Sequence, residues 1–226
     1  MRAFSAFLEK VYTTMFIGLV MLLPVTFLPM PWATLPHAKV GLLVLCTGIG
    51  MIAFVLARFL EGTLTLPKSW VVFSSLLLPV AYLISALATG ATRASLLGGG
   101  AEPHTVAIMF FWAALVILAA LAFRGRMELV RVQYAFLIGA GLVILFQLIR
   151  LFFGPEVLSF GGVFSGSSAS IVGSWHDLGI FLGLAAFFAV SLLSNTAHEM
   201  TNTTRWLVRT VAILSVFMLV VVNGLC

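Results

Sequence analysis

Arg150 lies close to the end of a long apolar run and follows Gln147 by three residues. Residues three apart share one face of a helix, so the guanidinium and the amide are expected to lie side by side. An arginine in such a place can bind a phosphate or diphosphate group through paired hydrogen bonds. The alternative is an arginine whose charged end extends along the helix to the lipid headgroups. Arg150 is therefore the first candidate for binding an anionic substrate.

A second candidate site is the segment Ser174-Trp175-His176-Asp177, which opens another apolar run. His176 could relay a proton, and Asp177 could act as a base or bind a cation. Ser174 and Asp177 also match the S-x-x-D capping box, in which the helix dipole favours the acid. Capping explains these two residues and leaves His176 without a structural role, so both interpretations stay open.

Motifs of many cofactor-dependent and hydrolytic enzymes are missing from the sequence. It has no P-loop, no dinucleotide-binding fingerprint, no H-E-x-x-H and no G-x-S-x-G. The two cysteines, Cys46 and Cys226, have no metal-ligand spacing, and no cluster of His, Cys and Asp is present. The sequence therefore predicts neither a cofactor nor a bound metal.

The composition indicates a membrane protein. Hydrophobic residues make up 62% of the 226 positions and charged residues only 8%, whereas a soluble domain carries about 25% charged residues. The apolar runs are unbroken and about twenty residues long, which favours membrane-spanning helices over the alternating strands of a membrane β-barrel. The net charge of +5 comes from scattered basic residues, so nucleic acid is not expected as a partner.

The apolar runs predict an all-α, polytopic transmembrane bundle of seven helices that forms a single domain over residues 1–226. Pro24 is expected to kink the first helix. A cleaved signal peptide is not expected, because no small-x-small cleavage site follows the first run. The predicted spans are residues 12–30, 40–57, 70–88, 106–123, 132–151, 175–193 and 206–225.

Lysine and arginine are distributed unequally between the two sides of these predicted helices. The N-terminal segment and the connections on its side carry nine of them, and the connections on the other side carry three. Cytoplasmic connections are enriched in Lys and Arg, so the asymmetry predicts a cytoplasmic N-terminus. The nine are Arg2, Lys10, Arg58, Lys68, Arg124, Arg126, Arg131, Arg205 and Arg209, and the three are Lys39, Arg93 and Arg150.

The predicted outer connections, residues 89–105 and 152–174, are long and rich in glycine. The second also contains more phenylalanines than a freely solvated loop would have. We expect it to lie in the membrane interface or to fold back into the bundle. Functional residues are often found in long loops on a rigid scaffold, so the outer side is the side to search.

Three further polar residues, Arg93, Glu102 and His104, lie in the first of these outer connections. They could line one site with Arg150 and His176, because all five are predicted to face the same compartment. The alternative for each of the three is an ordinary solvated loop residue. The sequence does not show whether they converge.

Two glycine pairs lie within apolar helices. Gly179 and Gly183 form a G-x-x-x-G pair, which is typical of a helix that another helix approaches closely. Gly139 and Gly141 are expected to serve packing in the same way. The first pair could also bind a partner helix.

The stretch from residue 145 to 181 resembles the polytopic O-antigen ligase and polymerase family of bacteria. The resemblance is carried by Phe146-Gln147, Arg150-Leu151, Gly154-Pro155, Phe160-Gly161 and Gly173-Ser174-Trp175-His176-Asp177-Leu178. Family members have a Gly-x-Trp-Asn-Asp-Leu-type run after a glycine-rich outer loop, and here His176 stands in place of Asn. The resemblance implies metal-independent transfer of a glycan from a polyprenyl diphosphate at the outer face of the bacterial cytoplasmic (inner) membrane.

This resemblance also bears on substrate binding and on partners. We expect Arg150, His176, Asp177 and Arg93 to contribute to binding of the lipid-linked glycan, with membrane lipids as the other partners. The family's own functional Arg and His residues lie mainly in a large outer loop that has no counterpart here. The sequence stops at Cys226 directly after the seventh predicted span, which predicts a truncated chain that is inactive alone.

Two other functional classes remain open. A non-catalytic membrane scaffold would need only low polarity and packing glycines, and both are present. A transporter component would be expected to show broken helices in matching halves and ionisable residues near mid-membrane. The centres of the predicted helices lack charge, which makes the transporter the weaker alternative.

Overall fold

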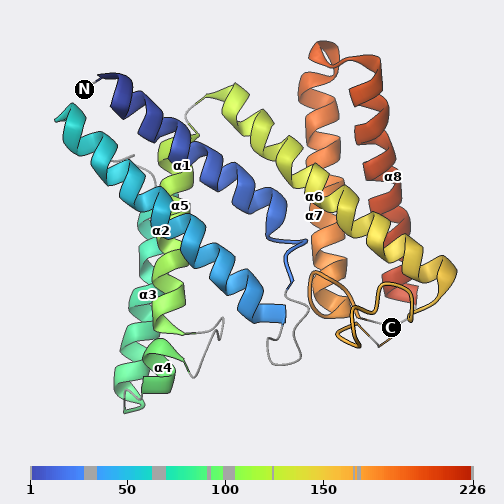
Figure 1. Cartoon of the computed structure of the whole chain (residues 1–226), viewed down its shortest axis with the longest axis horizontal. Coiled ribbons are helices and arrows are strands. Elements are labelled where there is room, and N and C mark those ends of the chain that lie inside the picture. The colour runs from blue at the N-terminus through green and yellow to red at the C-terminus, as the bar shows by residue number, and fades with distance from the viewer. Residues whose placement is uncertain are drawn as a thin grey trace. The chain divides into compact units, whose positions relative to one another are not determined.

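The computed structural model describes residues 2–27, 35–62, 70–90, 93–98, 105–123, 125–164, 166 and 169–224. Every regular element in these ranges is a helix, which confirms the all-α class (Figure 1). The elements are α1 (Arg2–Leu22), α2 (Leu35–Glu61), α3 (Trp70–Ala88), α4 (Arg93–Leu97), α5 (Val106–Ala122), α6 (Arg126–Phe153), α7 (Trp175–Thr196), η1 (Ala197–Glu199) and α8 (Asn202–Gly224).

The described helices confirm a polytopic membrane protein. Six of them, α1, α2, α3, α6, α7 and α8, are long and apolar enough to cross a membrane. The seventh predicted span corresponds to α5, which is apolar but has only 17 residues. At 1.5 Å per residue such a helix is about 25 Å long, which is at the lower limit for a hydrocarbon core of about 30 Å.

The first predicted span, residues 12–30, is placed wrongly, and the predicted kink at Pro24 is also wrong. α1 starts well before that span and ends before the proline. Proline lacks an N–H and disfavours the helical conformation in the residue before it, so Pro24 ends the helix instead of bending it. The N–H groups of Val25 and Thr26 both donate to the carbonyl of Leu22, at 3.0 and 2.8 Å, and close the turn.

Other helices extend beyond the predicted spans. α6 begins at Arg126 instead of residue 132, and α8 begins at Asn202 instead of residue 206. Hydropathy marks only the part of a helix that lies in hydrocarbon, whereas the backbone can stay helical through polar residues in the interface. The helix α4 has five residues and lies within residues 89–105, the connection predicted as a loop.

The described residues group into two compact units. The first comprises residues 1–19 and 36–128, and the second comprises residues 20–35 and 129–226. The single domain expected over the whole chain therefore stays a prediction.

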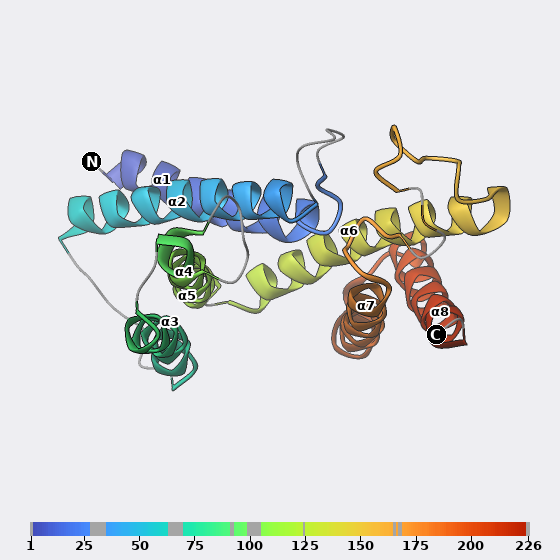
Figure 2. The same ribbon diagram turned by 90° about the horizontal axis from the view of Figure 1, so that it is seen from below.

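In the first unit, α1 and α2 run side by side in opposite directions (Figures 1 and 2). Their contact is an apolar cluster that includes Leu8, Tyr12, Phe54 and Ala57, together with Leu118 from α5. The rings of Tyr12 and Phe54 meet edge to face, with their centres 5.8 Å apart, a favourable arrangement for aromatic pairs. α3 and α4 both contact α5.

In the second unit, α6 packs against the hairpin that α7 and α8 form through η1 (Figure 1). The core at one end includes Val143 of α6, Leu178 and Leu182 of α7, and Met218 and Val222 of α8. These side chains are almost fully buried, and each large apolar side chain contributes about 1.5–3 kcal/mol on burial from water. The cluster fixes the end of α6 beside the start of α7 and the end of α8.

Helix direction alternates within each unit as a polytopic bundle requires. The start of α1 lies with the ends of α2 and α5 in the first unit. The end of α6 lies with the start of α7 and the end of α8 in the second. The predicted topology assigns the first set of ends to the cytoplasmic side and the second set to the outer side, and this assignment stays a prediction.

Candidate functional site

A cavity opens where the end of α6, the start of α7 and the end of α8 meet. Its volume is about 220 Å³, several times the volume of about 30 Å³ that a water molecule takes in the liquid. There is room for a phosphate-sized group and some water. The lining residues are Gln147, Arg150, Leu151, Gly154, Pro155, Trp175 and Met218.

Arg150, the principal predicted site residue, lines this cavity from the last turn of α6. Its side chain is buried, with 6% exposed. Nη2 donates to the carbonyl oxygen of Gly166 at 2.8 Å, and Cζ lies 5.6 Å from the ring centre of Phe146 and 6.0 Å from that of Phe164. Both ring distances are typical of cation–π contacts. The side chain therefore folds back onto its own unit, and its position relative to the lipid headgroups stays a prediction.

Two buried polar atoms at the cavity lack hydrogen-bond partners among the described residues. They are Nη1 of Arg150 and Oε1 of Gln147. A buried polar atom left unpaired costs about 1–3 kcal/mol, and more when the group is charged. The carboxylate of Glu156, an exposed residue, acts electrostatically on Arg150, but the two form no ion pair in the described part of the chain. Arg150 thus lines the cavity, and its buried Nη1 has no hydrogen-bond partner in the part of the chain that the structure describes.

The connection after α6 folds back over Arg150, as its aromatic content predicted. Phe164 is 1% exposed and contacts the rings of Phe27, Phe146 and Phe160. Phe152, at the end of α6, is 75% exposed, and its predicted position in the membrane interface stays a prediction. Two described parts of the connection therefore belong to the site: Gly154 and Pro155, which line the cavity, and the part that carries Phe164.

The start of α7 confirms the predicted capping box. The backbone N–H and the hydroxyl of Ser174 donate to Oδ2 of Asp177 at 2.9 and 2.7 Å, and the Asp177 N–H donates to the Ser174 hydroxyl at 3.2 Å. The indole Nε1 of Trp175 donates to the carbonyl of Val222 at 3.1 Å and ties α7 to α8. His176 is exposed and is not among the cavity-lining residues. Roles of His176 and Asp177 in substrate binding stay predictions.

Ser174→Ala is expected to lower the free energy of unfolding by about 1 kcal/mol, because the helix loses its N-cap hydroxyl. Asp177→Asn is expected to cost about 0.3–1 kcal/mol, because the amide no longer interacts as an anion with the helix dipole. Thermal unfolding of the full chain in detergent measures both. Ser194→Ala is the control, since this exposed hydroxyl donates only within its own helix. The capping role is contradicted when Ser174→Ala has no more effect than this control.

The predicted convergence of Arg93 with Arg150 stays a prediction. Arg93 is exposed at the first residue of α4, in the first unit, whereas Arg150 belongs to the second unit. Glu102 and His104 lie outside the described residues.

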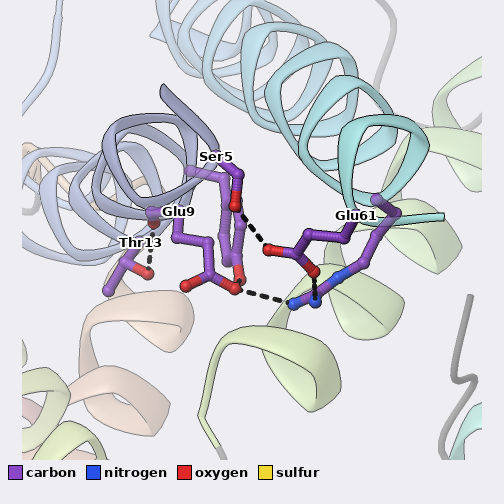
Figure 3. Close-up of polar contacts among 6 residues, drawn as sticks. Ser5, Glu9, Thr13 and Glu61 are labelled. Atoms are coloured by element: carbon purple, nitrogen blue, oxygen red, sulfur yellow. Dashed lines mark hydrogen bonds and ion pairs between the residues drawn. The ribbon is translucent and has the colours of Figure 1, made fainter. Parts of the chain in front are cut away.

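A polar cluster between α1 and α2 was not among the predicted sites (Figure 3). Arg58 pairs through Nη2 with Glu9 at 2.8 Å and through Nη1 with Glu61. The hydroxyl of Ser5 donates to the other oxygen of Glu61 at 2.5 Å, and the hydroxyl of Tyr12 points to Glu9 at 3.4 Å. In the sequence, Arg58 and Glu61 are three residues apart at the end of an apolar run, which is the one signal that could have indicated the cluster.

The glycines of the predicted packing pairs differ in their surroundings. A Cβ at Gly179 would lie 3.4 Å from Val222, so this glycine faces α8 of the same chain. A Cβ at Gly183 would have no atom within 4 Å. Gly139 makes the closest approach, since its Cβ would lie 2.5 Å from the carbonyl oxygen of Met21. The packing role is therefore confirmed for Gly179 and Gly139, and a partner helix stays a prediction.

Comparison with protein-family models, with curated proteins and with solved structures found no match to this chain. The residues around the cavity therefore carry the functional argument. They provide a buried cation whose Nη1 is unpaired among the described residues, a neighbouring amide and an indole, all at one end of an integral membrane bundle.

Proposed function

We propose that this chain is a membrane protein of the O-antigen ligase and polymerase type, acting at the outer face of the bacterial cytoplasmic membrane. Its substrate is a glycan carried on a polyprenyl diphosphate, and Arg150 binds the diphosphate. The observation that carries this proposal is the buried Arg150 at a cavity, with Nη1 unpaired among the described residues. Such a cation is stabilised when an anionic oxygen enters the cavity.

The chemistry of glycan transfer gives this arginine a use. In the transfer, a hydroxyl oxygen of the acceptor bonds to the sugar's anomeric carbon and gives up its proton, while the bond from that carbon to the diphosphate oxygen breaks. Negative charge therefore develops on the leaving diphosphate. A guanidinium already in place beside that oxygen stabilises the charge without reorganising. The amide of Gln147 can turn either its oxygen or its nitrogen toward a phosphate and its water shell.

Two observations support the substrate class and the side of the membrane. The resemblance of residues 145–181 supports a polyprenyl diphosphate donor. The nine-to-three distribution of Lys and Arg supports an outer position for the end of α6. A lipid-linked donor would present its diphosphate at the depth of that helix end, where the headgroup region begins.

Binding of the polyprenyl diphosphate tests the proposal. The full chain in lipid nanodiscs is titrated with a polyprenyl diphosphate, the corresponding monophosphate and the uncharged polyprenol. Arg150→Gln is expected to weaken diphosphate binding about 10- to 100-fold, because a hydrogen bond to a charged group contributes about 1.5–3 kcal/mol. Arg209→Gln is the matched control, since Arg209 is an exposed arginine of the same unit that stacks on Trp206. It is expected to leave the affinity within about twofold.

Two outcomes would contradict the proposal. Equal diphosphate affinity of the Arg150→Gln and Arg209→Gln variants would exclude Arg150 as the phosphate ligand. Equal binding of the polyprenol and the diphosphate would show that only the lipid tail is recognised, and a scaffold without a donor site would then be the better account.

A further inference from the structure

The two terminal nitrogens of Arg150 are in different situations. Nη2 is held by the carbonyl of Gly166 at 2.8 Å. Nη1 is buried and has no hydrogen-bond partner among the described residues. The guanidinium is therefore anchored through Nη2, whereas none of the described residues holds Nη1. An anchored cation with one free donor is prepared for a ligand before the ligand arrives.

The carbonyl that anchors Arg150 is itself held by the backbone around it. Gly166 is exposed and also accepts a hydrogen bond from the N–H of Ala169 at 3.1 Å. Two residues earlier in the chain, Phe164 is 1% exposed. Its ring lies 5.2 Å from that of Phe27 and 5.6 Å from that of Phe146. Phe164 is thus the nearest large apolar anchor for the segment that carries the carbonyl.

The backbone before Phe164 adopts a conformation that needs such an anchor. Leu158 and Phe160 have positive φ angles of 61° and 46°, and each non-glycine residue in this region costs about 1–3 kcal/mol. The N–H of Phe164 donates to the carbonyl of Ser159 at 3.1 Å, across this strained stretch. Burial of a phenylalanine ring contributes about 1.5–3 kcal/mol, which offsets much of the cost.

We infer that Phe164 is a positioning residue for Arg150, which holds the Gly166 carbonyl against Nη2 and so leaves Nη1 to an anionic phosphate oxygen in the cavity. The ring of Phe164 also lies under the guanidinium, with Cζ 6.0 Å from its centre. Arginine carries about 2 kcal/mol of rotamer entropy, which a free side chain would lose on binding. With Phe164 in place, this loss occurs on folding and not on binding.

The identity of the ligand rests on the proposed function, whereas the coupling between Phe164 and Arg150 rests on the contacts above. Phe164→Leu keeps an apolar side chain but removes the ring face and part of the anchor. It is expected to weaken polyprenyl diphosphate binding about tenfold in the nanodisc titration. Phe160→Leu is the matched control, because Phe160 belongs to the same ring cluster, is 41% exposed and makes no ring contact with Arg150. It is expected to stay within about threefold of the unmodified chain.

A double-mutant cycle separates positioning from a general structural role. When Phe164 acts through Arg150, Phe164→Leu has no further effect on diphosphate binding in the Arg150→Gln background. A general structural role predicts the same loss in both backgrounds and a parallel loss of polyprenol binding. The thermal midpoint of each variant reports its folding. Phe164→Met replaces Phe164→Leu in the cycle where the leucine variant does not fold.

The reactivity of Arg150 gives a readout that does not depend on the ligand. Phenylglyoxal modification, located by mass spectrometry, is expected to be slow at Arg150 in the unmodified chain and several-fold faster after Phe164→Leu. Unchanged reactivity and unchanged affinity in that variant would overturn the inference. When Arg150→Gln itself leaves binding unchanged, the proposed function fails, and the reactivity of Arg150 still decides whether Phe164 positions it.

Discussion

Gly139→Ala is expected to lower the free energy of unfolding of the full chain by about 2 kcal/mol. A Cβ at this position would lie 2.5 Å from the carbonyl oxygen of Met21 and 3.2 Å from Cγ of Pro24. The first contact is with backbone in the last turn of α1, and the second is with a rigid ring, so neither neighbour can move easily. Overpacking of this kind costs about 1–3 kcal/mol, of which alanine's better helix propensity recovers at most about 1 kcal/mol.

Two other glycines provide matched controls for Gly139→Ala. A Cβ at Gly141 would lie 3.9 Å from Val211, an ordinary contact, and one at Gly183 would meet no atom within 4 Å. Gly141→Ala and Gly183→Ala are therefore expected to be neutral or slightly stabilising. Thermal unfolding in detergent compares the three variants. A midpoint for Gly139→Ala equal to that of Gly183→Ala would show that α6 and the end of α1 do not pack as described.

The membrane-spanning parts of the fold could be predicted because hydrocarbon imposes a single requirement on the sequence. A segment in the core must satisfy its backbone within a helix and carry apolar side chains, so the apolar runs mark the helices directly. That requirement ends at the interface. Residues 126–131 are rich in charge and still helical, and hydropathy gives no information on where such a segment stops.

The candidate site was predictable where its contacts are local. Gln147 and Arg150 share a helix face by their spacing, and both line the cavity. Ser174 and Asp177 follow a capping pattern that depends on four consecutive residues, and the structure has the same hydrogen bonds. The anchor of Arg150 could not be predicted, because the carbonyl of Gly166 is a backbone group that any residue would provide. The chain also passes through left-handed residues before that carbonyl contacts the guanidinium, and such a path is not readable from spacing.

The cluster around Arg58 was missed for a related reason. The first span was predicted to begin at residue 12, which left Glu9 outside any helix. Once α1 begins at Arg2, Ser5 and Glu9 are one turn apart on the face toward α2, as Figure 3 shows. In the sequence, Arg58 indicates only topology, as one of the basic residues on the predicted cytoplasmic side. Its pairing with a carboxylate from a separate helix depends on how α1 and α2 pack, which residue spacing does not reveal.

Arg58→Met is therefore expected to lower the free energy of unfolding by about 2 kcal/mol. Exposed ion pairs contribute about 0.2–1 kcal/mol, and breaking a fully buried pair costs about 3–5 kcal/mol. The Arg58 side chain is 13% exposed, and those of Glu9 and Glu61 are 42% and 29% exposed, so an intermediate value applies. Methionine keeps an apolar side chain but removes the guanidinium, which lies 5.6 Å from the ring centre of Phe54, and leaves two carboxylates near each other without a cation.

The charge explanation for Arg58→Met can be separated from loss of packing. Glu9→Gln added to Arg58→Met removes one of the unpaired carboxylates and is expected to restore part of the stability, as a double-mutant cycle measures. Arg209→Met is the control, because the exposed Arg209 stacks on Trp206 and its loss is expected to change stability by less than about 0.5 kcal/mol. If Arg58→Met equals this control, the cluster does not stabilise the α1–α2 pair. If it destabilises without recovery in the double variant, Arg58 acts through its packing and not through its ion pair with Glu9.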